Sequence, residues 1–292
     1  MDIIQDSFIR ERLDYQPIID RSPLPALDNT RLIVWPVVNV EYWDASRTMP
    51  RQALPAPTGQ GFIPDVPNWS WHEYGMRVGF WRMKRLFDRY DIRPTLSING
   101  YVCKAYPQVA QAARDASWEF MGHGYKQMPT HLLDDEGATI RDTIDEIRAF
   151  TGKAPIGWLG PGLTETADSL DLLSEAGIRY VGDWVIDDEP CQLKTKNGPM
   201  VAMPYTVELN DIPIMAVQHH SGSELWTRVR DTFECLYHES DERIKVMAIA
   251  VHPFLSGAPH RFKYLEKAIS YLAGKTGVRF MTGEEIYHWY TS

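Results

Sequence analysis

Residues 32–40 read LIVWPVVNV, and the residue that follows them is Glu41. The run is short, apolar at nearly every position and rich in β-branched side chains. These features are typical of a strand that is buried on both faces of a parallel sheet. Because the strand leads directly into a carboxylate, the stretch indicates an α/β fold with a polar group at the carboxyl end of a buried strand.

The rest of the chain continues with short apolar runs separated by segments of helical periodicity. Further strands are predicted at residues 94–98, 118–121, 156–159, 179–183, 246–251 and 278–281, and two more between 200 and 218, joined at Asn210–Asp211. Helices are predicted at residues 71–90, 104–116, 136–150, 167–176, 224–237, 262–273 and 284–290. Strands that alternate with helices in this way are typical of βαβ units around a parallel sheet.

The chain is predicted to form a single catalytic domain over residues 31–292, preceded by an extended N-terminal arm over residues 1–30. Three prolines break any helix in the arm: Pro17, Pro23 and Pro25. A long loop rich in Pro and Gly, residues 49–70, follows the first strand. Loops of this length in a compact domain are usually functional.

The composition excludes several classes of partner. The formal net charge of −9 argues against a nucleic acid or an anionic membrane surface, since either would require clustered Lys and Arg. Three cysteines stand far apart without a CxxC motif, which favours reduced thiols over a disulfide framework. The first residues do not resemble a signal peptide, and no apolar run approaches the ~20 residues that span a bilayer. A cytoplasmic location is therefore predicted.

Parallel barrels carry their chemistry at the carboxyl ends of the strands, and three ionisable residues stand at such ends. Glu41 has apolar and aromatic neighbours, which are expected to raise its pKa toward that of a useful general base. The alternative is a solvated loop carboxylate. His123 lies between two glycines, which allow a tight turn, and His252 follows an apolar run and precedes a proline. Catalytic roles are predicted for all three.

Ten further residues near strand ends are candidates for substrate binding: Asn39, Gln127, Trp158, Gly160, Pro161, Trp184, Asp187, Asp188, Tyr205 and Asn210. Trp158 and Trp184 are expected at the mouth of a pocket, where indoles and side-chain amides can recognise a planar substrate. Asp187-Asp188 has a second interpretation as an ordinary acidic turn, and His219-His220 can equally be an exposed corner. The remaining histidines are expected at the surface or in packing: His72, His131, His238, His260 and His288.

Taken in order, these strand ends resemble the polysaccharide-deacetylase-like superfamily (NodB-homology, carbohydrate esterase family 4 type), and within it the branch of the bacterial metal-independent allantoinases. The resemblance covers about residues 31–290. It rests on these segments: Val38-Asn39-Val40-Glu41, Phe120-Met121-Gly122-His123-Gly124-Tyr125, Gly157-Trp158-Leu159-Gly160, Asp183-Trp184, Asp187-Asp188, Pro204-Tyr205-Thr206, Asn210-Asp211 and Val251-His252-Pro253. It implies a deformed (β/α) barrel with about seven parallel strands, and hydrolysis of an amide, cyclic amide or related C–N bond.

Two positions depart from the members that deacetylate sugars. Those members resemble one another in an Asp-Asp pair after the first strand and in a His-x-x-x-His pair, which together bind a divalent metal. Here Tyr42 follows Glu41, and Gln127 stands four residues after His123. Because Gln is a weak, neutral ligand for zinc, the sequence favours a site without a tightly bound metal. If a metal such as zinc is present, its predicted ligands are Glu41, His123 and His252.

The leading hypothesis is a hydrolase of a C–N bond in a small amide, cyclic amide, imide or ureide. Glu41 would activate water, His123 would orient the scissile group or stabilise the oxyanion, and His252 would protonate the leaving nitrogen. One alternative is a metal-dependent N-deacetylase of an acetylated sugar, and another is a barrel that binds a small ligand without catalysis. No GxSxG, Walker or HExxH motif is present, and no nucleotide cofactor is supported. The allantoinase-like relatives suggest a homo-oligomer.

Overall fold

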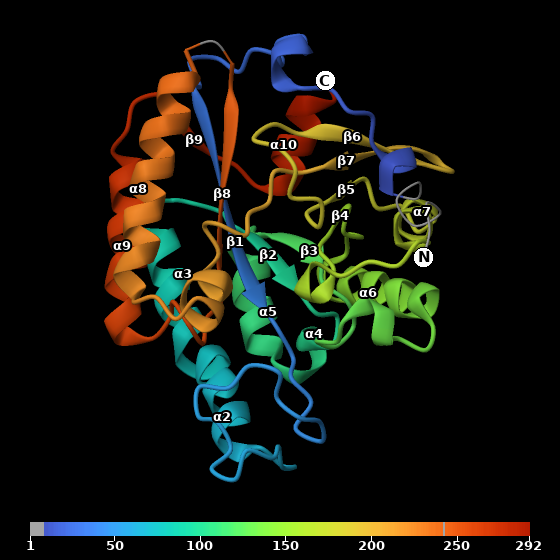
Figure 1. Cartoon of the computed structure of the whole chain (residues 1–292), viewed down its shortest axis with the longest axis vertical. Coiled ribbons are helices and arrows are strands. Elements are labelled where there is room, and N and C mark those ends of the chain that lie inside the picture. Colours follow the sequence, from blue (N-terminus) through green and yellow to red (C-terminus); the bar gives the residue numbers. More distant parts are fainter. Residues whose placement is uncertain (1–8, 242) are drawn as a thin grey trace.

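The computed structural model describes residues 9–241 and 243–292, so the first eight residues of the predicted arm lie outside the described residues. Strand β1 (Leu32–Val40) runs through the middle of the structure (Figure 1), and all nine of its residues are buried. It pairs in parallel with β2, β8 and β9. The first predicted strand thus has parallel partners along both of its edges.

The strands form one curled, mostly parallel sheet in the order β6-β7-β5-β4-β3-β2-β1-β8, with β9 paired to β1. The strands after β1 are β2 (Thr95–Ile98), β3 (Glu119–Gly122), β4 (Gly157–Trp158), β5 (Tyr180–Val181), β6 (Cys191–Thr195), β7 (Gly198–Ala202), β8 (Lys245–Val251) and β9 (Val278–Phe280). Within the described residues, the antiparallel pairing is that of β6 with β7. The predicted α/β class and deformed barrel are confirmed.

Helices cover the outside of the sheet, with α3, α8 and α9 beside β1 and β8 in Figure 1. The helices are α2 (Val66–Tyr74), α3 (Phe80–Arg89), α4 (Val102–Ala105), α5 (Pro107–Asp115), α6 (Glu136–Thr151), α7 (Ser169–Glu175), α8 (Gly222–Glu239), α9 (Pro259–Ala273) and α10 (Gly283–Tyr290). Among the described residues, none of these helices has both the length and the apolarity that crossing a bilayer requires.

Alternation along β1 divides the core into two parts. Trp35 and Val37 point into the barrel, where they pack in a cluster that includes Met121 and Tyr180. Side chains at even positions, such as Val38, belong to a second cluster with residues of α3, α8 and α9. Each fully buried aliphatic side chain contributes about 1.5–3 kcal/mol, so a strand buried on both faces stabilises both layers. Asn39 and Glu41 continue the inward row and therefore face the interior at its carboxyl end.

The two ends of the curled sheet are joined through loop segments. The backbone N–H of Val246 donates to the carbonyl of Asp188 at 2.9 Å, and that of Ala250 donates to the carbonyl of Leu209 at 3.1 Å. A parallel bridge also links Asn210 to Ala250. The segment that follows β7 therefore lies beside β8, next to the end of that strand which leads to His252.

The two strands predicted between residues 200 and 218 are wrong in part. The chain instead forms the hairpin of β6 and β7, and residues 212–217 (Ile212–Val217) form a short π-helical turn. A short apolar run does not distinguish a strand from a buried helical turn. Pro213 at the start of the turn suits the first positions of a helix, because it needs no N–H partner there.

The described part of the N-terminal arm packs against the catalytic domain of the same chain. Arg12 makes an ion pair with Asp171, and Arg21 makes one with Asp187. Leu24 and Leu27 contact the core cluster inside the barrel. In this structure, residues 9–30 cover one side of the domain.

The helix predicted at residues 71–90 is divided into three segments in the structure. Its middle segment packs closely against the loop that follows His252. The helix begins earlier, at Val66, and a π-helical stretch, Gly75–Gly79, separates α2 from α3. A Cβ atom on Gly79 would lie 2.0 Å from the carbonyl oxygen of Pro253, and one on Gly75 would lie 2.6 Å from the backbone nitrogen of Phe254. Glycine at both positions allows this close approach, so the helix fixes the backbone directly after His252.

Replacing Gly79 by Ala is expected to lower the free energy of unfolding by about 1–3 kcal/mol, because the added methyl meets backbone that cannot move freely. Denaturant unfolding measures the loss. Gly274→Ala is the matched control, since a Cβ there would meet the carbonyl of Ser270 at 3.6 Å. Equal stability of the two variants would show that the contact with Pro253 is not tight in solution.

Candidate active site

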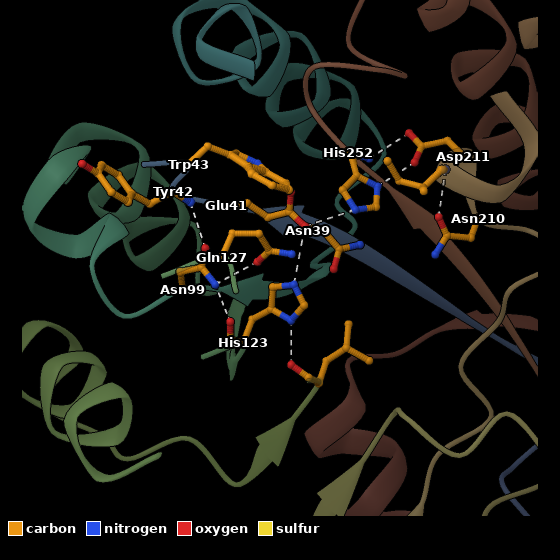
Figure 2. Close-up of polar contacts among 12 residues, drawn as sticks. Asn39, Glu41, Tyr42, Trp43, Asn99, His123, Gln127, Asn210, Asp211 and His252 are labelled. Carbon is orange, nitrogen blue, oxygen red and sulfur yellow. Dashed lines mark hydrogen bonds and ion pairs between the residues drawn. The ribbon is translucent and has the colours of Figure 1, made fainter. Parts of the chain in front are cut away.

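Glu41 is the point at which the predicted catalytic residues meet. It follows β1 directly, and 7% of its side chain is exposed. Its Oε1 atom lies 3.5 Å from Nε2 of His123 and 3.5 Å from Nε2 of His252 (Figure 2). Its other carboxylate oxygen accepts a hydrogen bond from Nε1 of Trp43 at 3.0 Å. Three residues far apart in the sequence are thus brought together at the ends of β1, β3 and β8.

The ring of His123 is fixed from behind by a backbone group. Its Nδ1 atom lies 2.6 Å from the carbonyl oxygen of Leu159. A carbonyl can only accept, so Nδ1 carries the proton of the neutral ring and Nε2 faces Glu41. Gly124 has a φ of +71°, a conformation that favours glycine, and lets the chain turn sharply after the histidine.

The ring of His252 is fixed by a buried carboxylate. Its Nδ1 atom lies 2.6 Å from Oδ1 of Asp211, whose Oδ2 accepts from the backbone N–H of His252 and the hydroxyl of Ser256. Burial lowers the pKa of His252, but the charges of Asp211 and Glu41 and the hydrogen bonds to them raise it to about 10. The ring is therefore a cation at neutral pH.

The expectation that apolar neighbours raise the pKa of Glu41 is wrong. Burial does act in that direction, but the charge of His252 and the hydrogen bond from its ring outweigh it, so the pKa of Glu41 falls below its ordinary value. The sequence argument weighed only the neighbours of Glu41 along the chain. The cation that faces it comes from another strand.

Asn99 organises the loops around these residues, and the sequence analysis missed it. Its Oδ1 accepts from the backbone N–H of Tyr42 at 2.8 Å. Its Nδ2 donates to the carbonyl of His123 and, at 3.1 Å, to Oε1 of Gln127. One amide thus ties together the residues that follow β1, β2 and β3. Its place just after a predicted strand was the available signal.

Three of the predicted substrate-binding residues form a buried polar group inside the barrel. Asn39 donates to the hydroxyl of Tyr205 at 3.2 Å, and Asn210 donates to the same hydroxyl at 3.4 Å. Each is less than 10% exposed. Asn39 precedes Glu41 by two residues on the inward row of β1, and Asn210 precedes Asp211, so the group supports both ends of the catalytic set.

Asp187 and Asp188 lie elsewhere, which overturns their predicted place in a substrate-facing loop. Asp187 pairs with Arg21 of the arm, and the carbonyl of Asp188 accepts from Val246 near the start of β8. Val246 and His252 are six positions apart in the sequence, and at the rise of a strand this is roughly 20 Å. After β5 the chain leaves the sheet and passes beside the start of β8, where Asp188 accepts from Val246. Hydrophobic periodicity along the sequence does not predict this path.

Trp158, Pro161 and Trp184 lie on one side of the site. Trp158 packs on the outer face of β4 and, with Pro161, lines a cavity that Glu165 also reaches. The indole N–H of Trp184 donates to Glu165 at 3.0 Å. The backbone N–H of Gly160 donates to Asp183 at 2.7 Å. Hydrogen bonds within the protein thus already occupy the indole N–H of Trp184 and the backbone N–H of Gly160.

Asp211 is a residue of this buried polar cluster to which the sequence analysis gave no role. Asn210–Asp211 was interpreted as a turn between two strands, whereas the structure places the Asp211 side chain against His252. The available signal was a carboxylate directly before the apolar run at residues 212–217. The structure buries the Asp211 side chain completely. A buried carboxylate requires a partner, and in this barrel the partner is an imidazole.

Known proteins resemble this chain across most of its length. A protein of Schizosaccharomyces pombe that is named as a polysaccharide deacetylase is 28% identical over 236 residues, which cover 74% of this chain and 74% of its own. The peptidoglycan deacetylase of Helicobacter pylori is 26% identical over 72% of this chain and 82% of its own. The crystal structure of Puue allantoinase matches with a TM-score of 0.82 at 25% identity, over 95% of this chain and 97% of that one. The chain is thus similar, in sequence and in fold, to proteins of the polysaccharide-deacetylase type. No family model matches the sequence.

Similarity to the polysaccharide-deacetylase-like superfamily, Puue allantoinase included, confirms the predicted enzyme class, a hydrolase of carbon–nitrogen bonds other than peptide bonds. The divalent metal of its sugar-deacetylating members does not fit the residues present. The ring of Tyr42 turns aside to pack on Tyr101 at 4.6 Å between centroids, and the amide oxygen of Gln127 accepts from Asn99. Across residues 9–241 and 243–292, no three His, Cys, Asp or Glu side chains are arranged to hold a metal ion.

The pKa of His252 makes the contribution of Asp211 to stability depend on pH. Because folding raises the pKa of His252 from 6.5 to about 10, the stabilisation is complete below pH 6.5 and is lost as the pH rises through about 10. Asp211→Asn is therefore expected to lower the free energy of unfolding by about 3 kcal/mol at low pH, and by progressively less as the pH rises. Urea unfolding across that range measures it. Asp231→Asn, an exposed change on α8, is the control, and a cost for Asp211→Asn that does not vary with pH would contradict the assignment.

Proposed function

We propose that this protein hydrolyses a C–N bond in a small amide, cyclic amide, imide or ureide, without a tightly bound metal. The observation that carries the proposal is the row Asp211, His252, Glu41 and His123, in which an ionised carboxylate lies 3.5 Å from two imidazoles. An ionised carboxylate beside an imidazolium supplies a general base and a general acid at one site.

Glu41 acts first, as the general base. It takes a proton from a water molecule while the oxygen of that water bonds to the carbonyl carbon of the substrate, giving a tetrahedral intermediate with a negative oxygen. The low pKa of Glu41 keeps it ionised and so available for this step at neutral pH. The indole of Trp43 holds the other carboxylate oxygen and so sets the orientation of the group.

His252 acts second, as the general acid. It gives its Nε2 proton to the leaving nitrogen as the C–N bond breaks and the carbonyl re-forms, which yields an acid and an amine. The protonated Glu41 then passes its proton to Nε2 of His252 across 3.5 Å, and the starting pair is restored. Asp211 stays hydrogen-bonded to Nδ1 throughout and stabilises the cationic form of the ring.

His123 has the geometry of an orienting group rather than an oxyanion donor. Its Nδ1 proton is used by Leu159, so the neutral ring presents a lone pair at Nε2. A lone pair accepts an N–H of the substrate or a proton of the attacking water. This favours substrates whose scissile group carries an N–H, such as a ureide, over esters.

Several predictions from the sequence complete the proposal. Gln127 and Trp184 are the proposed contacts to a planar substrate. A homo-oligomeric state and a cytoplasmic location stay predictions.

Replacing Glu41 by Gln is expected to lower kcat by roughly 10²–10⁴-fold, because the amide has the shape of the carboxylate but cannot accept the proton. A screen of ureides and cyclic imides that follows product formation identifies the substrate and measures the loss. Glu234→Gln, an exposed change on α8, is the control. Undiminished turnover in Glu41→Gln would remove the general-base role.

We expect the purified, untagged protein to contain far less than one equivalent of zinc, nickel or manganese. The reason is that Tyr42 and Gln127 supply neither an acid nor a second imidazole. Plasma mass spectrometry of protein that has not been treated with a chelator measures the metal content. Near-stoichiometric metal, with activity on N-acetylated sugars that a chelator abolishes, would establish the metal-dependent deacetylase instead.

A further inference from the structure

One peptide group connects His123 to a second buried acid. The carbonyl oxygen of Leu159 lies 2.6 Å from Nδ1 of His123. The N–H of the same peptide unit belongs to Gly160 and donates to Oδ1 of Asp183 at 2.7 Å. His123, the Leu159–Gly160 peptide and Asp183 follow β3, β4 and β5, which are neighbours in the sheet, so the chain of hydrogen bonds crosses three strand ends.

The position of this peptide is tightly constrained. A Cβ atom on Gly160 would lie 2.5 Å from the carbonyl oxygen of Thr164 and 3.0 Å from Oδ1 of Asp183. Glycine is therefore needed for the turn to close on the acid. The preceding peptide is held as well, because its N–H, that of Leu159, donates to the carbonyl of Gly122 at 2.9 Å. The backbone on both sides of the Leu159–Gly160 peptide is therefore constrained.

Beyond the bond from Gly160, the side chain of Asp183 contributes little to holding the fold together. Its Oδ2 atom is buried and has no hydrogen-bond partner among the residues that the structure describes. Burial and the nearby charge of Glu165 raise the pKa of Asp183 well above its ordinary range. A buried acid that makes one hydrogen bond with its side chain to the rest of the fold costs stability, and such a group is retained where it serves the site.

We propose that Asp183 is a positioning residue for His123, acting through the Leu159–Gly160 peptide; its role in catalysis rests on the proposed function. Hydrogen bonding at the N–H of an amide polarises the group and makes its carbonyl a stronger acceptor. The stronger acceptor holds the proton of His123 on Nδ1 and keeps Nε2 directed at Glu41.

The arrangement parallels that of the other histidine. Asp211 contacts Nδ1 of His252 directly and makes that ring a cation. Asp183 reaches His123 through a neutral peptide, so it fixes the tautomer without placing a charge against the ring. The two acids thus give the two imidazoles different roles at the same carboxylate, Glu41.

The test measures the tautomer of His123 in the full-length, chelator-treated protein labelled with ¹⁵N-histidine. Long-range ¹H–¹⁵N spectra separate the two ring nitrogens, and His123→Gln assigns the signal. In the wild type, and in Asp183→Asn, whose amide oxygen still accepts from Gly160, the proton is expected on Nδ1. In Asp183→Ala the Nε2-protonated form is expected to rise at least severalfold. If Asp183→Ala does not fold, Asp183→Ser, which is too short to reach Gly160, takes its place.

Glu165→Gln is the matched control, because it removes the neighbouring carboxylate without touching the Gly160 bond. It is expected to leave the His123 signal unchanged, as is the His252 signal in every variant. A wild-type tautomer in Asp183→Ala would overturn the proposal, and so would an equal change in Glu165→Gln. No substrate is needed, so failure of the proposed reaction leaves this readout intact. With a substrate in hand, Asp183→Ala should lower kcat roughly 10-fold with little change in KM.

Discussion

The contact between the Glu41 carboxylate and the imidazole of His252 is the interaction on which the site depends. A carboxylate buried this deeply would be costly to ionise alone, and an imidazolium buried alone would be equally costly. Each offsets the other, and Asp211 on the far side of the ring makes the cation the stable form. The result is a row of alternating charge across the ends of the strands. Loss of His252 would leave two buried carboxylates, Glu41 and Asp211, without the cation that lies between them.

This row exists because the sheet curls far enough for its two ends to meet. The hydrogen bond from Ala250 to Leu209 brings the segment after β7 alongside β8, and Asp211 follows on that segment. Closure of the barrel is therefore also the step that assembles the acid half of the site. The π-helical stretch Gly75–Gly79 acts from the other side, pressing on the loop that begins at His252. Backbone packing, rather than side-chain length, sets the position of the ring.

The two histidines show how one fold obtains two functions from one residue type. His252 has an anion behind it and is a proton donor, whereas His123 has a carbonyl behind it and presents a lone pair. What lies behind each Nδ1 decides what Nε2 can do, in the same way that outer partners tune histidines at metal sites. Tyr42 and Gln127 stand where the sugar-deacetylating proteins have a metal-binding acid and imidazole, and both rings face Glu41.

The amino-acid sequence determined the elements of this protein that depend on local pattern. The bounds of β1 and the alternation of strands and helices follow from hydrophobic periodicity. Glu41, His123 and His252, which the structure brings together, were predicted as a group because chemistry at a parallel sheet gathers at strand ends. The charge of Glu41, the partnership of Asp211 and the remote position of Asp187 were decided only by the tertiary structure. Each depends on which residue from another strand lies opposite across a few ångströms. Electrostatic free energy varies with that distance and with burial, and the order of residues along the chain reveals neither quantity directly.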